Sequence, residues 1–176
     1  MSALDKASLQ AAALSYLERY SSSTENLRRV LMRRVKKACR DNEDAQEAIE
    51  LAAIVDAIVE RYVASGLVDD RAFARGRAAT LARRGDSRRA IVHKLRGKGV
   101  ADTDARAALD DIADGATPDA VDLESAWNYA RKRRLGPYRL DPEIREARRE
   151  KDLAALCRRG FSYGIASAVI RAEAPR

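Results

Sequence analysis

The chain has 176 residues, of which 46% are apolar and 35% are charged. This length suits one or two compact domains, and the apolar share is enough to bury a core. The net charge of +7, from 34 basic and 27 acidic residues, favours an acidic partner such as nucleic acid or an acidic protein surface, although general solubility also explains it. The chain shows no stretch of signal-peptide form and no run of about 18 apolar residues, so we expect a cytoplasmic protein without a membrane partner.

The first third of the chain predicts three helices. Alanine is abundant and runs of β-branched residues are short, which favours helices over a sheet. Apolar residues recur at helical spacing in each segment, and Gly66 ends the third. The predicted starts, in chain order, are Ser8, then Ser23 or Thr24, then Asn42 with Glu43 and Asp44.

Two further triplets of helices follow, separated by the break at 115–118. The predicted starts in the second are Asp69 or Asp70, Gly85-Asp86-Ser87, and Asp102 as a cap; the third has a helix around Leu123, a start at Asp141-Pro142-Glu143, and Ser162 as a cap. In the segment 142–158, Ile144 and Ala147 fall on a different face from Leu153 and Leu156, because nine residues rotate a helix by about half a turn. This segment is therefore either two helices or one helix with two sets of neighbours.

Part of the chain occurs twice. An offset of 61 residues (156 − 95) pairs Leu95 with Leu156 and Gly99 with Gly160, and a weaker offset of 64 (81 − 17) relates the first triplet to the second. A period of this size indicates a copied supersecondary unit, and stacked units present long binding surfaces. The predicted fold is all-α, with three tandem three-helix repeats at 1–66, 67–115 and 119–176 in an elongated arrangement, straight or curved.

Charge is segregated by helix. Acidic residues crowd the third helix of the first two repeats, whereas basic residues crowd the second helices and the ends of the third repeat's helices. Protein surfaces usually intersperse positive and negative side chains, so we expect the segregated basic side chains to form a stripe that binds a phosphate backbone or an acidic filament. For any single residue, a solvated helix face is the simpler interpretation. The candidate binding residues are Arg28, Arg29, Arg33, Arg34, Lys36, Lys37, Arg40, Arg83, Arg84, Arg88, Arg89, Lys94, Arg96, Lys98, Arg131, Lys132, Arg133, Arg134, Arg158 and Arg159.

The sequence contains no catalytic or metal-binding constellation, so we expect neither enzymatic activity nor a cofactor. His93 is the only histidine and has no candidate partner, and two cysteines without ligand spacing do not predict zinc. Cys39 and Cys157 are expected to be reduced, and the Asp69-Asp70 pair is better explained by a helix N-terminus than by a metal. Most aromatic residues lie on apolar stripes and are expected to pack in the core; Tyr138 and Tyr163 lie in or beside turns and are freer.

Several motifs resemble those of the RecX regulatory proteins. They are Gly66-Leu67-Val68-Asp69-Asp70 followed by Phe73-Ala74, Leu95 to Val100, Leu156 to Tyr163, and Tyr16-Leu17 with the serine turn and Leu27 to Leu31. The resemblance covers nearly the whole chain, with Val100 where isoleucine is usual and a longer first repeat. It implies an all-helical, non-enzymatic protein. The family has no catalytic residues to assign to this sequence, and its motif positions are largely structural. It also implies that the protein binds the filament of RecA recombinase on single-stranded DNA and modulates, mostly by inhibition, RecA activities in recombination, DNA repair and the SOS response.

Two other classes stay open from the residues alone. A direct DNA-binding protein would use the basic helices as helix-turn-helix modules and would prefer a specific duplex sequence. A scaffold for protein partners would show little salt dependence of DNA binding. For the regulator we expect a monomer that contacts RecA, single-stranded DNA and also double-stranded DNA.

Overall fold

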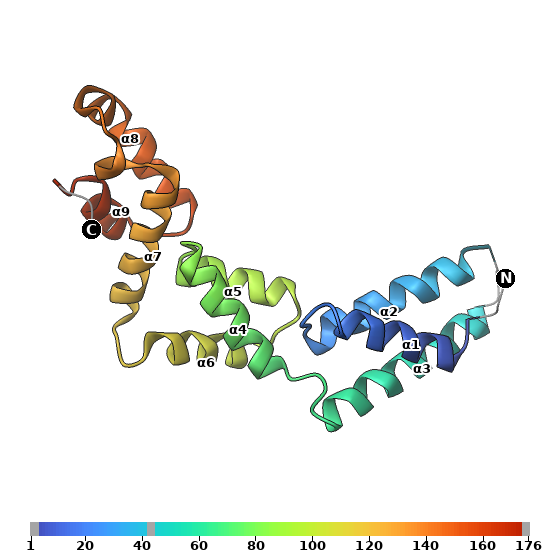
Figure 1. Cartoon of the computed structure of the whole chain (residues 1–176). Helices are drawn as coiled ribbons and strands as arrows, with labels where there is room; N and C mark the ends of the chain where they lie inside the picture. The colour runs from blue at the N-terminus through green and yellow to red at the C-terminus, as the bar shows by residue number, and fades with distance from the viewer. Residues whose placement is uncertain (1–3, 42–44, 174–176) are drawn as a thin grey trace. The chain divides into compact units, whose positions relative to one another are not determined.

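The computed structural model describes residues 4–41 and 45–173, which contain nine α-helices, two short 3-10 helices and no strand (Figure 1). The all-α prediction is confirmed. The elements are α1 (Lys6–Leu17), α2 (Thr24–Ala38), a 3-10 helix (Cys39–Asp41), α3 (Ala45–Ala64), α4 (Asp70–Arg83), α5 (Arg88–Gly97), α6 (Asp102–Ala113), α7 (Pro118–Arg133), a second 3-10 helix (Gly136–Tyr138), α8 (Pro142–Arg158) and α9 (Tyr163–Ile170).

The helix starts follow the capping chemistry of the sequence. The Ser23 hydroxyl accepts from the Asn26 N–H at 3.2 Å, and one Asp69 carboxylate oxygen accepts from the two N–H groups of Arg71 and Ala72. Such bonds satisfy donors that a helix leaves unpaired in its first turn. Asp141 and Ser162 cap α8 and α9 in the same way.

The structure corrects one predicted detail of the helices and decides between the two alternatives left open for another. Asp102 is not the cap of α6, because Ala101 holds that position without a side-chain bond and Asp102 lies in the first turn, paired with Arg96. The segment 142–158 is one helix, in which Leu156 is buried and Ile144 is exposed. The predicted start of the third helix at 42–44 lies outside the described residues.

The chain forms two compact units by its internal contacts. The first consists of residues 1–73 with 98–100, and the second of residues 74–97 with 101–176. The division into three repeats at 1–66, 67–115 and 119–176 stays a prediction.

The core of the first unit lies between α1, α2 and α3. Leu27, Leu31 and Val35 form the buried face of α2, and α3 contributes Val55 and Ile58. The i, i+4, i+8 spacing on α2 places its apolar residues on one stripe and leaves the opposite face for polar side chains.

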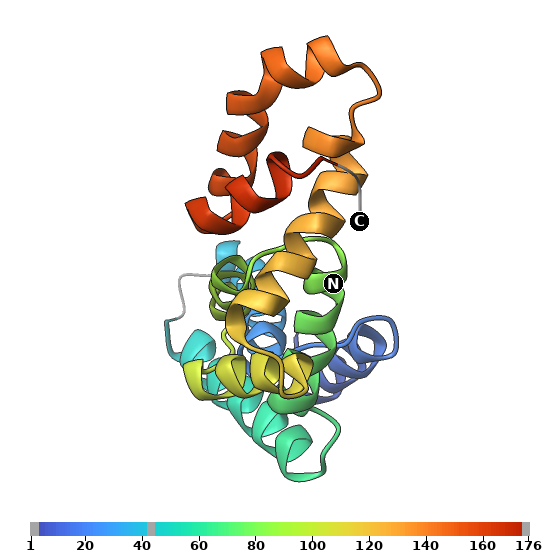
Figure 2. The same ribbon diagram turned by 90° about the vertical axis from the view of Figure 1, so that its left-hand side faces the viewer.

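The second unit buries alanines together with a leucine on each of α4 and α6, Leu81 and Leu109, and larger residues on α5. Ile91 and Leu95 of α5 are buried, as are Ala74 and Ala78 of α4 and Ala105 of α6. Farther along the chain, α7, α8 and α9 pack around Ala126, Ala130, Leu156, Phe161, Val169 and Ile170 (Figure 2).

The first unit contains a joint between the start of α2 and the turn that follows α5. The Ser23 hydroxyl donates to the Lys98 carbonyl, and the Thr24 N–H donates to a carboxylate oxygen of Asp70 at 2.6 Å. Gly99, at φ +77°, lies so close that an added Cβ would be 2.3 Å from the Glu25 Cβ. Glycine is required here by both its positive φ and this approach.

The second unit contains the same joint at the start of α5. The Ser87 hydroxyl donates to the Arg159 carbonyl at 3.0 Å, and the Arg88 N–H donates to Asp122 at 2.7 Å. Gly160, at φ +97°, would place a Cβ 2.5 Å from the Ser87 hydroxyl. We call these two arrangements the serine joints; they give a structural reason for the repeat of Leu95–Gly99 at Leu156–Gly160.

Candidate nucleic-acid interface

The solvent face of α2 carries the densest set of basic side chains without partners. Arg33, Arg34, Lys36 and Lys37 are exposed, and within the described residues none of them makes an ion pair or a side-chain hydrogen bond. We call these four residues the α2 basic face. The buried stripe on the other side of α2 fixes the helix, so these cations point to solvent as a group.

The earlier cations of α2 are engaged with acids. Arg28 forms a bidentate pair with Asp56 of α3, at 2.6 and 3.0 Å, and Arg29 pairs with Glu25 one turn earlier at 2.9 Å. The hydrogen bonds that Arg28 donates to the Asp56 carboxylate raise the pKa of Arg28. These pairs are exposed, and such pairs contribute little stability, so they remain available to rearrange around a stronger anion.

The cations of α5 are mostly occupied. Lys94 lies 2.6 Å from Asp86, Arg96 forms a bidentate pair with Asp102, and the half-buried Arg88 lies 3.8 Å from Asp110. The bond from Arg96 lowers the pKa of Asp102. Among the predicted cations of this helix only Arg89 is exposed and unpaired within the described residues.

Asp86 is a buried carboxylate that two partly exposed cations contact. It is 1% exposed, accepts from Lys94, and lies 2.9 Å from the Arg159 guanidinium, which also stacks over the Tyr129 ring at 5.2 Å. Its second carboxylate oxygen is buried and has no hydrogen-bond partner in the described part of the chain. Breaking a buried pair leaves an uncompensated charge, so Lys94 and Arg159 have a structural role.

The remaining predicted cations divide in the same way. Four make hydrogen bonds: Arg83 to Thr80, Lys98 to Asn26, Arg131 to Asn128, and Lys132 to the Arg83 carbonyl. Five are exposed without a partner among residues 4–41 and 45–173: Arg40, Arg84, Arg133, Arg134 and Arg158. Thr80 and Asn128 lie one turn before their arginines, whereas the partners of Lys98 and Lys132 come from distant parts of the chain and are set by the tertiary fold.

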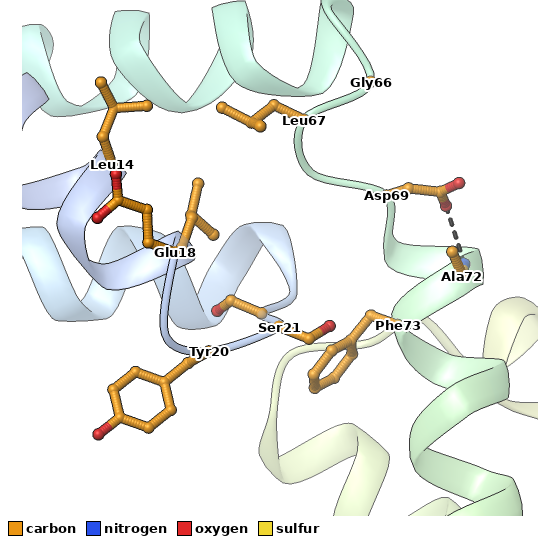
Figure 3. A pocket seen from close by; sticks show the side chains of 11 residues that line it. Leu14, Glu18, Tyr20, Ser21, Gly66, Leu67, Asp69, Ala72 and Phe73 are labelled. Carbon is orange, nitrogen blue, oxygen red and sulfur yellow. Dashed lines mark hydrogen bonds between the residues drawn. The ribbon is translucent and has the colours of Figure 1, made fainter.

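The Gly66–Ala74 motif is only partly structural. Val68 and Ala74 are buried and Asp69 caps α4, but Leu67 is 50% exposed and Phe73 is half-buried. Both line a groove of about 490 Å³ between the end of α1, the serine turn and the start of α4 (Figure 3). Leu67 lies in a turn, where helical periodicity gives no information, so the sequence did not single it out as a surface residue.

Within the described ranges no group of three or more His, Cys, Asp or Glu side chains could hold a metal ion, and no helix there is long and apolar enough to cross a bilayer. His93 is exposed, and Cys39 and Cys157 are free and half-buried.

Comparisons with known proteins agree with this architecture. The family model described as "RecX, second three-helix domain" matches residues 69–109. The chain is 44% identical over 162 residues to "Regulatory protein RecX" of Myxococcus xanthus (strain DK1622), covering 92% of this chain and 83% of that protein. It is 32% identical over 160 residues to the protein of the same name from Agrobacterium fabrum (strain C58 / ATCC 33970), covering 90% and 79%.

Solved structures show the same fold. "Crystal structure of regulatory protein RecX" matches with a TM-score of 0.59 and 26% identity, covering 93% of this chain and 72% of that one. "Crystal structure of RecX from Lactobacillus salivarius" matches with a TM-score of 0.61 and 21% identity, covering 94% of both chains. The motifs, the three-helix architecture and these identities over most of both sequences place the chain: it belongs to the RecX family of non-enzymatic regulatory proteins.

Proposed function

We propose that this protein binds the RecA–single-stranded DNA filament and modulates, mostly by inhibition, the RecA activities in recombination, DNA repair and the SOS response. The relatives are named as regulatory proteins, and the family name links them to RecA. We further propose that it acts as a monomer and contacts DNA, single-stranded and double-stranded, as well as RecA.

The α2 basic face is the observation that carries this proposal. Four neighbouring cations on one rigid helix, with no acid to pair them in the described structure, create a concentrated positive surface. Such a surface gains affinity for a phosphate backbone by releasing condensed counterions, and it does so without reading sequence. A regulator that must act anywhere along a filament needs this kind of binding.

The pairing on α5 weighs against the alternative of a sequence-reading helix-turn-helix protein. A recognition helix presents free side chains to base edges in the major groove. Here Lys94 and Arg96 are held by Asp86 and Asp102, so reading bases would require Lys94 to leave the buried Asp86 carboxylate.

Charge reversal on the α2 basic face tests the proposal. In the triple variant Arg33→Glu, Arg34→Glu and Lys37→Glu, we expect the Kd for RecA filaments, measured by cosedimentation, to rise about tenfold or more. The same variant should lose most of its effect on DNA-dependent ATP hydrolysis by RecA, with an unchanged circular dichroism spectrum. Wild-type protein should change ATP hydrolysis at concentrations too low to bind naked DNA.

A second triple variant controls for net charge. Arg71, Arg75 and Arg77 on α4 are also exposed and make no side-chain ion pair within the described residues, and their replacement by Glu changes the charge equally. We expect this control to bind filaments within about threefold of wild type under the same salt. Unchanged cosedimentation of the α2 variant, or equal loss in both variants, would remove the α2 basic face from the binding surface.

A further inference from the structure

Trp127 packs against the core of α7, α8 and α9, as its place on the apolar stripe predicts, but its side chain is only partly buried. It is half-buried and lines a groove of about 400 Å³ on α7, together with Leu123, Asn128, Arg131 and Tyr138. The Tyr138 ring meets the Trp127 ring edge-on, with centroids 6.1 Å apart. The groove therefore has an aromatic wall that is held in place and partly open to solvent.

The polar groups of this groove follow the order of α7. Glu124 lies one turn before Trp127, whereas Asn128 and Arg131 lie beside and after it, with Arg131 donating to the Asn128 side-chain oxygen at 2.8 Å. Seven residues separate Glu124 from Arg131, which corresponds to about 10 Å along a helix. The groove thus offers an acceptor at one end, donors at the other, and an aromatic surface between them.

Unpaired cations continue from the donor end. Arg131 follows Trp127 at i+4 and so lies on the same side of α7, and Arg133 and Arg134 are exposed at the end of this helix, where Arg134 is the left-handed C-cap. Arg133 and Arg134 have no side-chain partner in the described part of the chain. Anions are therefore favoured immediately next to the aromatic wall.

We propose that this groove binds a nucleobase of single-stranded DNA, stacked on Trp127, with the adjoining phosphates on Arg131, Arg133 and Arg134. This inference rests on the proposed function and names a specific contact within it. Proteins that bind single strands without sequence preference combine a basic track with aromatic stacking. An apolar side chain of a protein partner would also suit the aromatic wall, but it would not use the neighbouring cations.

Trp127 is the only tryptophan, so its fluorescence reports directly on the groove. We expect a single-stranded oligonucleotide to quench this emission, with the same midpoint as its binding curve measured by anisotropy of an end label. An oligonucleotide of equal length and charge in which abasic sites replace the bases should leave the emission nearly unchanged. Equal quenching by both strands would overturn the stacking, because the phosphates alone would then explain the signal.

Substitution provides a second measurement. Trp127→Leu should raise the Kd for single-stranded DNA about tenfold, the fold-change that corresponds to about 1.4 kcal/mol. Tyr163→Leu is the matched control, since Tyr163 is 61% exposed on α9 and does not line this groove. The Kd of this variant for single-stranded DNA should stay within about twofold of the wild-type value. The abasic comparison uses wild-type protein and so decides the question even if the Trp127 variant unfolds.

The outcomes separate this inference from the proposed function. DNA binding by anisotropy without any change in Trp127 emission would overturn the groove assignment while leaving the regulator proposal intact. Loss of binding to DNA-free RecA in the Trp127 variant, with DNA binding unchanged, would put a protein side chain in the groove and also overturn it. If filaments are not bound by wild-type protein at all, the proposed function fails, whatever the fluorescence shows.

Discussion

Gly99→Ala tests the serine joint of the first unit. The substitution adds one methyl group at φ +77°, where the new Cβ would meet the Cβ and Cγ of Glu25 at 2.3 and 2.4 Å. Real Cβ atoms do not approach other atoms this closely, and Glu25 cannot move its Cβ without moving α2. Gly66→Ala is the matched control, because Gly66 belongs to the same unit and has φ +73° but no atom within 4 Å of the added Cβ.

The difference between the two variants isolates the close contact. Both substitutions place an L-residue in the left-handed region, which costs about 1–2 kcal/mol, and both reduce the entropy of the unfolded chain equally. Only Gly99→Ala adds overpacking against Glu25, which costs typically about 1–3 kcal/mol. We therefore expect the free energy of unfolding to fall about 1–3 kcal/mol further for Gly99→Ala than for Gly66→Ala.

Urea unfolding followed by circular dichroism measures this difference. With an m-value of about 1 kcal/mol per molar urea for a unit of this size, the midpoint should fall roughly 1–3 M further for Gly99→Ala. The emission of Trp127, which belongs to the other unit, follows that unit separately. Equal losses in the two alanine variants would refute the close approach of the Lys98–Val100 turn to α2.

Further predictions concern the second joint and the binding surface. Ser87→Asp keeps a cap on α5 but places a carboxylate next to the Arg159 carbonyl, to which it cannot donate a hydrogen bond. We therefore expect the free energy of unfolding, measured by thermal unfolding, to fall by about 1–3 kcal/mol. The control Ser162→Asp should lose less than about 0.5 kcal/mol, because the Ser162 hydroxyl makes only its capping bond in the described structure. Burial raises the pKa of Asp122 above 3.8, although the Arg88 N–H donates to its carboxylate, so the folded state holds the proton more tightly than the unfolded chain. The contribution of Asp122 to stability therefore falls as the pH rises from 3.8 through the pKa of the folded state. Asp122→Asn should remove this contribution from the pH dependence of the free energy of unfolding, and an unchanged pH dependence would contradict the burial argument. Binding of single-stranded DNA through the α2 basic face should weaken with salt, with a log–log slope of about −3 for four phosphate contacts, and a slope near zero would exclude phosphate contacts.

The helices could be predicted from the sequence because their causes are local. The stripe of Leu27, Leu31 and Val35 lies within one helix, and the caps at Ser23 and Asp141 act within one turn. The segment 142–158 was ambiguous for a non-local reason. Its apolar residues lie on two faces, and which face of α8 is buried depends on the helices that pack against it.

Whether each basic side chain is paired with an acid or free could not be predicted from the sequence. Lys94 and Asp86 are eight residues apart, Arg159 reaches the same carboxylate from 73 residues away (159 − 86), and Arg96 meets Asp102 across a turn. A basic run therefore contains both structural and free charges in a proportion that only the fold determines. The prediction of a basic surface stays a proposal, now narrowed to the cations that the described structure leaves unpaired.

The serine joints also explain why no single offset aligns the whole chain. The donor sides, Ser23 and Ser87, differ by 64 residues (87 − 23), whereas the acceptor turns at Gly99 and Gly160 differ by 61 (160 − 99). Donor and acceptor lie on different helices whose connections differ in length, so each side of the joint keeps its own period.

The chemistry of the joint accounts for the residue types at both sides. An N-cap aspartate can accept from the first turn of its helix, but a carboxylate cannot also donate to a carbonyl. A serine hydroxyl does both at once: Ser87 accepts from the Ala90 N–H at 3.2 Å and donates to Arg159. Asp69 and Asp141, by contrast, accept only. A cap that also has to hold a second helix end must therefore carry a hydroxyl, and the turn that meets it needs a glycine small enough to let its carbonyl approach.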